Sequence, residues 1–316
     1  MTRIIYFLLL SSFSHTCFSQ AYLKLKKRQL PLHASFKENG KNTVFYLDRD
    51  QLYVGMYNEG WGENWQKKLI DFTPRESNWI KKHNNIFFYS DESRYYVLFP
   101  YIYLGGTNDE DELGFIVTEF DKDFSPLKSR TRITRKMSEL GEEKNKVSRV
   151  AGGFNKPLFK VLPHPDGKAL SVITTVSTRG GKTLMGIFTY DTENGETEVF
   201  SHTFPRGLIK SFLSSPNEKF QQGIEDSPSF SCPFGDLSID KNGNVWMLKK
   251  MEGEDEGYKT GWYLLKIDLK KKKVEKRHFD LTEGTFAYER LGLVADPAGF
   301  VHVGGVYRDN KKEAFR

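Results

Sequence analysis

The sequence predicts an all-β protein, a β-propeller of about five blades, on the strength of three observations. Short segments rich in β-branched and aromatic residues, with the length of strands, recur from residue 44 onward, while helical periodicity is scarce after residue 20. An acidic turn recurs ahead of these strands, and an apolar strand that ends in aspartate follows at a distance. Aromatic residues make up 14% of the 316 residues, which is enough apolar surface for a large core.

The amino terminus has the layout of a secretory signal peptide. A short basic region precedes the apolar block Ile4–Leu10, and small polar residues follow. The signal peptide is expected at residues 1–19, with Cys17 and Ser19 at positions −3 and −1 of the cleavage site. The mature chain is then a single domain, 20–316, exported to the periplasm, the outer surface or the extracellular space. A lipoprotein acylated at Cys17 is the less favoured alternative, because no aliphatic residue lies three positions upstream.

The predicted strands are bounded by glycine, asparagine or aspartate. They are Val44–Leu47, Leu52–Gly55, Tyr95–Phe99, Leu170–Val176, Val245–Leu248 and Val301–Val303. The acidic turns, in which Asp or Asn caps the backbone and Gly takes the left-handed conformation, start at Asp48, Asp91, Asp166, Asp240 and Asp296. The strands that end in aspartate close at Asp71, Asp121, Asp191 and Asp268. Radial repetition of one four-stranded unit explains the order of these signals better than a sandwich of unrelated hairpins does.

The last predicted hairpin stops at Arg316, so the final blade is incomplete at the carboxyl end. Two explanations stay open, because folded proteins avoid an unpaired strand edge. Either an N-terminal strand such as Leu23–Leu25 or Val44–Leu47 completes the blade, or the chain is a piece of a longer protein.

One segment carries a family resemblance. Ser238–Leu248 resembles the Asp-x-x-Gly-x-apolar-Trp blade motif of secreted and sensor-type bacterial propellers, including NHL-type repeats, and Leu293–Val301 resembles a weaker copy. A leader ahead of an aromatic-rich repeat domain is also similar to exported Bacteroidetes-type propellers of unknown function. The resemblance implies a fold that serves binding as often as catalysis. The segment approaches the sialidase Asp-box, but one extra residue between Asp240 and Gly243 argues against a sialidase.

The histidine, acidic and cysteine residues that could catalyse a reaction or bind a metal do not occur at the spacings that those functions need. The seven histidines show no ligand spacing, so zinc is not expected. The acidic clusters Asp109–Glu112 and Glu252–Glu256 do not follow the calcium-loop pattern, so no cofactor is expected and calcium is a weak alternative. Cys232, the lone mature thiol, is expected to be a buried apolar residue rather than a nucleophile.

The loop after Leu52–Gly55 is the preferred ligand contact. It places Tyr57, Trp61, Asn64 and Trp65 in a Gly-rich stretch, where Trp rings stack on sugar faces and amides bond hydroxyl groups. Packing of both tryptophans between sheets is the alternative. We therefore expect an exported, non-catalytic binding module for a glycan, a peptide or a partner protein, without a transmembrane span and able to associate with the cell surface. The alternative function is a carbohydrate-active hydrolase with channel-facing carboxylates.

The formal net charge of +6 comes with three basic clusters, Lys24–Arg28, Arg130–Lys136 and Lys270–Lys273. Nucleic acid is not an expected partner outside the cytoplasm, and anionic glycans or lipopolysaccharide suit the charge better. Solvated surface is the leading interpretation of these clusters.

Overall fold

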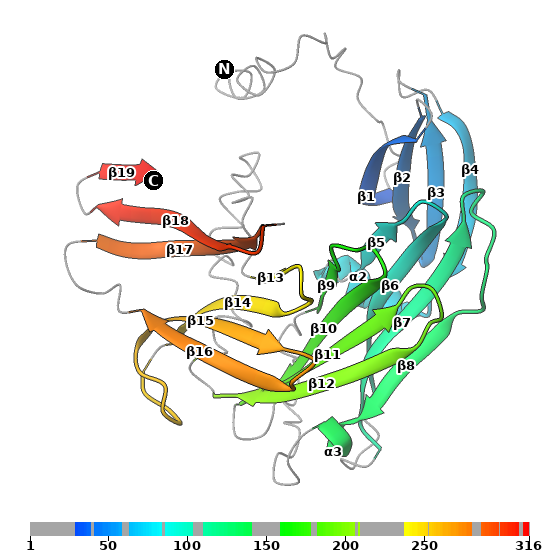
Figure 1. Ribbon diagram of the computed structural model, residues 1–316. Helices are drawn as coiled ribbons and strands as arrows, with labels where there is room; N and C mark the ends of the chain where they lie inside the picture. Colours follow the sequence, from blue (N-terminus) through cyan, green and yellow to red (C-terminus); the bar gives the residue numbers. More distant parts are fainter. Residues whose placement is uncertain are drawn as a thin grey trace. The chain divides into compact units, whose positions relative to one another are not determined.

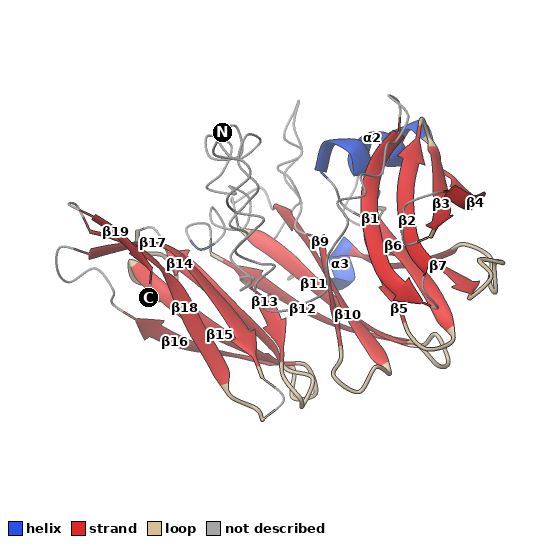
Figure 2. Cartoon of the chain, turned by 90° about the horizontal axis from the view of Figure 1, so that it is seen from above, coloured by secondary structure: helices blue, strands red, loops and turns tan. Residues whose placement is uncertain are grey.

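The computed structural model describes residues 29–38, 41–58, 63–83, 86–103, 110–140, 159–177, 182–205, 208, 237–251, 253–279, 286–296, 298–309 and 312–315. These residues form an all-β protein, as predicted, and Figure 2 shows strands joined by turns, together with the short helices α2 (Pro74–His83) and α3 (Met137–Leu140). Neither helix is long and apolar enough to cross a membrane. The expected signal peptide, Trp61, Cys232 and the cluster Lys24–Arg28 lie outside the described residues.

In the described residues the strands form five sheets, labelled in Figure 1, in which strands consecutive in the sequence are neighbours. The first sheet contains β1 (Gln29–Glu38), β2 (Lys41–Asp48), β3 (Gln51–Tyr57) and β4 (Glu63–Asp71). The second contains β5 (Phe87–Ser90), β6 (Arg94–Tyr103), β7 (Glu112–Asp121) and β8 (Thr131–Lys136). The third contains β9 (Phe159–Pro163), β10 (Ala169–Ser177), β11 (Thr183–Asp191) and β12 (Thr197–Phe204). The fourth contains β13 (Leu237–Ile239), β14 (Val245–Met251), β15 (Gly261–Asp268) and β16 (Lys273–Phe279). The fifth contains β17 (Phe286–Ala295), β18 (Val301–Asp309) and β19 (Lys312–Phe315).

The chain divides into two compact units, residues 1–98 with 118–129 and residues 99–117 with 130–316, so β6 and β7 contribute to both. The core of the first unit is aromatic. Phe45 stacks on Phe88 with ring centroids 4.4 Å apart, and Tyr95 stacks on Phe124 at 4.5 Å. All four rings are buried, and such pairs add about 0.5–1.5 kcal/mol each to the free energy of burial.

The core of the second unit lies between the third and fourth sheets. One hydrophobic cluster joins Ile173 and Ile187 of the third sheet to Val245, Met247 and Leu265 of the fourth. Burial along β11 is nearly continuous, whereas along β15 it alternates residue by residue. A continuous pattern means that both faces of a sheet are covered, so the third sheet is an inner layer of this unit.

Helix α2 was not predicted from its periodicity, although its start carries a local signal. The Thr73 hydroxyl accepts the Glu76 N–H at 3.3 Å, and the Glu76 carboxylate accepts the Thr73 N–H at 2.9 Å. This reciprocal pair is a capping box, and Pro74 occupies the first helical position, where its missing N–H costs nothing.

Candidate functional site

Three of the acidic turns predicted from the sequence, those at Asp91, Asp240 and Asp296, are hairpin turns held by their own first residue. One carboxylate oxygen of Asp240 accepts the backbone N–H groups of Asn242 and Asn244 at 2.9 and 3.0 Å. The other accepts the Asn244 side-chain amide at 2.9 Å and the Trp246 indole N–H at 2.8 Å. Burial alone would raise the pKa of Asp240, but these bonds from Trp246 and Asn244 hold it below the ordinary value. The carboxylate is therefore an ionised acceptor that serves the fold.

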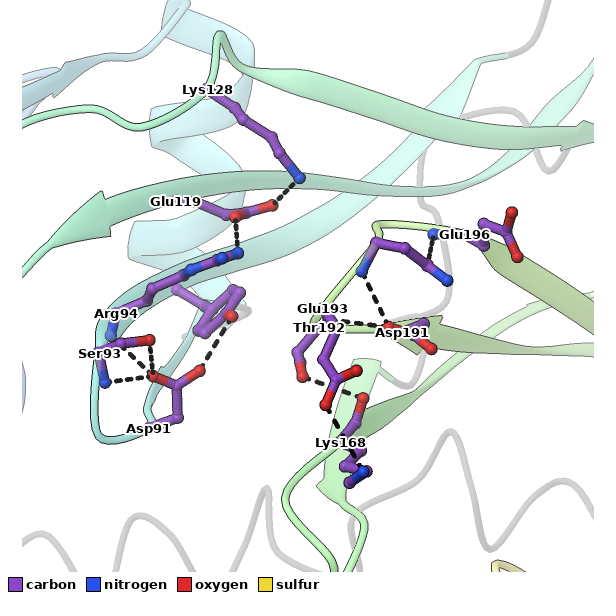
Figure 3. A network of polar contacts seen from close by, with 12 residues as sticks. Asp91, Ser93, Arg94, Glu119, Lys128, Lys168, Asp191, Thr192, Glu193 and Glu196 are labelled. Carbon is purple, nitrogen blue, oxygen red and sulfur yellow. Dashed lines mark hydrogen bonds and ion pairs between the residues drawn. The ribbon is translucent and has the colours of Figure 1, made fainter.

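The bond between Asp240 and Trp246 joins the residue that starts the turn to a side chain of the next strand, and we call such a bond the turn bond. A turn bond is also present in three other sheets. It joins Asp91 to the Tyr96 hydroxyl at 3.0 Å, His164 Nε2 to the Ser171 hydroxyl at 2.9 Å, and Asp296 to His302 Nε2 at 2.7 Å. Asp91 also accepts the Ser93 and Arg94 N–H groups, and Figure 3 shows these residues together at the turn. The recurrence explains why an aspartate precedes so many strands.

In the third sheet a histidine takes the position of the aspartate. The His164 carbonyl accepts the Gly167 N–H at 2.9 Å, as the Asp240 carbonyl accepts the Gly243 N–H at 2.9 Å. Asp166, which the sequence analysis placed at the start of this turn, lies two residues later and accepts the Lys168 N–H at 3.0 Å. Burial lowers the pKa of His164, which favours the neutral imidazole beside Ser171.

Within the second unit the turns contact one another in sequence order. A Cβ added to Gly243, which has φ +81°, would lie 3.2 Å from His164 Cε1. Between the fourth and fifth sheets, Lys241 Nζ donates to the Ala298 carbonyl at 2.9 Å, and the Ala295 N–H donates to the Ser238 hydroxyl at 2.9 Å. Successive sheets of this unit therefore meet through equivalent turns.

An ion-pair network around one buried carboxylate lies near the turn bond of the second sheet (Figure 3). The Glu119 side chain is 2% exposed and accepts Arg94 Nη1 at 3.1 Å and Lys128 Nζ at 3.2 Å. Two cations on one buried carboxylate compensate the cost of removing its charge from water. Glu119 is thus a structural residue of the first unit.

The described residues of the acidic clusters Asp109–Glu112 and Glu252–Glu256 take part in a turn, an ion pair and a backbone hydrogen bond of the fold. Glu256 and Gly257, with φ +48° and +75°, form the tight turn between Asp255 and Tyr258, and Glu256 forms an ion pair with Lys182 of the third sheet. In the other cluster Asp111 is 2% exposed and its carbonyl accepts the Met137 N–H at 2.8 Å. No group of three or more His, Cys, Asp or Glu side chains suited to a metal ion occurs among the residues described.

The structure separates the side chains of Tyr57 and Trp65, the two predicted contact residues whose side chains it describes. Tyr57 is 5% exposed and its ring covers Gly55, where an added Cβ would lie 2.7 Å from Tyr57 Cε2. Trp65 pairs with Met56, and a register shift at Asn64 precedes it, so alternation places Tyr57 and Trp65 on opposite faces of the first sheet. The side chain of Asn64, like Trp61, lies outside the description.

Of Tyr57 and Trp65, the predicted contact residues whose rings the structure describes, Trp65 has its ring available at the surface. It is 37% exposed, and its ring meets the buried Phe124 edge to face, with centroids 5.8 Å apart. Lys67, two residues along the same face, donates to the Asp123 carbonyl at 3.3 Å and approaches the Ser125 hydroxyl at 3.4 Å. We call Trp65 and Lys67 the Trp65 surface; it combines an anchored aromatic ring with a neighbouring cation.

Comparison with known proteins finds no matching family model and no matching curated protein. Among solved structures, the chain is 10% identical to an ACO/RPE65 chimera, with a TM-score of 0.36, covering 85% of this chain and 52% of that chain. It is 10% identical to a variant of the Synechocystis apocarotenoid oxygenase, with a TM-score of 0.35, covering 86% and 56%. It is 11% identical to the polysaccharide lyase Uly1, with a TM-score of 0.25, covering 95% and 85%. The chain thus spans about half the length of the first two structures, and similarities this weak carry no argument about its activity.

Proposed function

We propose that the chain is an exported β-propeller that binds a glycan through the Trp65 surface and catalyses no reaction on it. Three findings support a propeller: the sheets are meanders of consecutive strands, the turn bond repeats from sheet to sheet, and neighbouring sheets of the second unit meet through equivalent turns. Radial stacking of such sheets buries both faces of each one. The proposal assigns one blade to each of the five described sheets, which is consistent with about five blades.

The single observation that carries the binding proposal is the anchored, exposed ring of Trp65. Phe124, 1% exposed, fixes the ring from one side. A ring that is already immobilised loses little conformational entropy when it stacks on a sugar face, so more of the contact energy appears as affinity. Lys67 beside it offers a donor to hydroxyl or carboxylate oxygens of the same ligand.

The non-catalytic part of the proposal is supported by the hydrogen bonds of the aspartates in the repeated turns. Asp91, Asp240 and Asp296 each accept backbone N–H groups and one side chain of the following strand. An acid and base for glycoside cleavage must instead face each other across the substrate. The alternative function, a carbohydrate-active hydrolase, would have to draw its carboxylates from the clusters Asp109–Glu112 and Glu252–Glu256.

The test is a glycan and peptide array probed with the mature chain, followed by titration of the glycans bound. We expect Trp65→Ala to weaken binding about tenfold or more, and Trp65→Phe to weaken it less, because loss of one stacking contact is worth roughly 1–2 kcal/mol. Phe300→Ala is the matched control, since Phe300 is 67% exposed and lies in another sheet turn. Unchanged glycan affinity in Trp65→Ala refutes the contact surface, and release of reducing ends from a bound glycan favours the hydrolase.

A further inference from the structure

We propose that a second surface, formed by β6 and β8 in the second unit, binds an anionic polysaccharide. It consists of Tyr101, Tyr103, Arg130, Arg132 and Lys136, and we call it the arginine–tyrosine face. It uses strands other than those of the Trp65 surface, so it goes beyond the proposed function and does not depend on it.

The geometry begins with two arginines whose guanidinium carbons lie over aromatic rings. Arg130 Cζ lies 4.9 Å from the centroid of Phe99, and Arg132 Cζ lies 5.0 Å from the centroid of Tyr101. Arg132 Nη1 also donates to the Tyr101 hydroxyl at 2.9 Å. Cation–π contact and a hydrogen bond together hold the Arg132 guanidinium in one orientation. An immobilised cation loses little entropy on binding an anion.

The register of the sheet places further cations on the same face. Arg132 pairs with Ile116 and Lys136 pairs with Glu112, so Arg132 and Lys136, four residues apart, point to one side of β8. From Arg132 to Lys136 the row spans about 13 Å at roughly 3.3 Å per residue. Arg130, directly before β8, lies over Phe99, which shares a face of β6 with Tyr101. Arg130, Arg132 and Lys136 are exposed, as is Tyr103, 44% exposed, on the neighbouring part of β6.

Two of these cations have no neutralising partner among the described residues. Arg132 and Lys136 form no ion pair with a carboxylate within that part of the chain, whereas Lys68, Lys81, Lys128 and Lys182 each do. Glu112 is the one carboxylate that the register places opposite this row, against three cations. The exposed charges of Arg132 and Lys136, on one side of β8, fit a ligand with regularly repeated negative charge.

The use of the aromatic rings favours a polysaccharide over a nucleic acid. Proteins that bind single-stranded nucleic acid present free ring faces on which bases stack. Here the guanidinium of Arg132 covers one face of Tyr101, and that of Arg130 covers the buried Phe99. Within the described residues, Tyr103 is the single ring of the arginine–tyrosine face without a cation over it, whereas a strand of successive bases needs several free rings. What the surface offers is planar guanidinium groups, which bind sulfate or carboxylate groups through paired N–H donors.

The test measures binding of the folded chain to four polymers by isothermal titration at low and physiological salt: heparin, a polyuronate, uncharged dextran and single-stranded DNA. We expect heparin or the polyuronate to bind, with an affinity that falls as salt rises, and dextran not to compete. The double variant Arg132→Gln/Lys136→Gln should weaken that binding about 10- to 100-fold, since each charge-assisted contact contributes about tenfold. Tyr101→Phe keeps the ring but removes the hydroxyl that holds Arg132, so a smaller loss of a few fold is expected.

The matched control is Lys160→Gln/Lys270→Gln, which removes the same charge at two exposed positions of other sheets. Circular dichroism and melting of each variant show that it is folded before its affinity is compared. An equal loss of affinity in both double variants overturns the proposal, because the binding then follows net charge alone. Preference for DNA over both anionic polysaccharides, or no binding to either of them, also overturns it. Trp65→Ala should leave the affinity for the anionic polysaccharide unchanged, because Trp65 is not part of the arginine–tyrosine face. Failure of the glycan proposal for the Trp65 surface can therefore be told apart from failure of this one.

Discussion

Replacing Asp240 by alanine removes the acceptor of the turn bond to Trp246 and of three further hydrogen bonds within the same turn. The Asp240 carboxylate accepts four hydrogen bonds and is 5% exposed, and two of the donors belong to Asn244, which is 8% exposed. A hydrogen bond to a charged group contributes about 1.5 kcal/mol or more, and a buried donor left without a partner cannot regain it from water. If only the two bonds from Asn244 count, Asp240→Ala lowers the free energy of unfolding by about 3 kcal/mol.

The assay is urea unfolding followed by circular dichroism, which gives the free energy of unfolding for each variant. Asp166→Ala is the matched control, because Asp166 lies in the equivalent turn of the third sheet but is exposed and accepts the Lys168 N–H alone. A change within about 0.5 kcal/mol is expected for the control. Equal losses for the two variants, or a loss below about 1 kcal/mol for Asp240→Ala, refute the structural role of the turn bond.

Acid should destabilise the protein through the same carboxylates. Burial opposes ionisation of Asp91 and Asp240, but hydrogen bonds from the turn hold the pKa of each below its ordinary value. The stability that a lowered carboxyl pKa provides is present above the unfolded-state pKa of about 3.9 and is lost as the pH falls through the folded-state pKa. The free energy of unfolding should therefore decrease below about pH 5, and Asp240→Asn should show a shallower decrease. Parallel pH profiles for the two proteins contradict this assignment.

Two further substitution pairs test the packing of turns and ion pairs. Gly243→Ala and Gly253→Ala both place a side chain at positive φ, which costs about 1 kcal/mol. Gly243→Ala also brings a Cβ to 3.2 Å from His164, whereas the Cβ of Gly253→Ala meets no atom within 4 Å. The melting temperature should therefore fall further in Gly243→Ala. Glu119→Gln should lower the free energy of unfolding by about 2 kcal/mol, because the buried acceptor of two charge-assisted hydrogen bonds becomes an amide with one neutral acceptor oxygen. Glu193→Gln, whose ion pair with Lys168 is exposed, should change it by less than about 1 kcal/mol; similar values for both would show that burial of the carboxylate is unimportant.

The strands and turns were predictable because their signals are local. The predicted strand Leu170–Val176 lies inside β10, and Val245–Leu248 opens β14. The turn at Asp240 forms as expected, with Gly243 at φ +81°, since an aspartate cap and a glycine fix such a turn within five residues. Helix α2 was missed because periodicity was the signal sought, while its start is marked by the capping box of Thr73 and Glu76.

The candidate sites were less predictable because they depend on which face a side chain takes. One extra residue at Asn64 shifts the register, so Tyr57 is buried on one face while Trp65 is exposed on the other. His164 replaces an aspartate in the turn bond, which composition alone does not reveal. The contact of Arg132 with Tyr101 joins β8 to β6 across β7, a pairing that exists only once the sheet is formed.

The measurement that tests the central claim most directly is a crystal structure of the mature chain that places all five sheets. The proposal predicts sheets in sequence order about a common axis, with the turns that begin at Asp91, His164, Asp240 and Asp296 at one end of that axis. Two sheets packed face to face as a sandwich, or equivalent turns at opposite ends of the molecule, would contradict it.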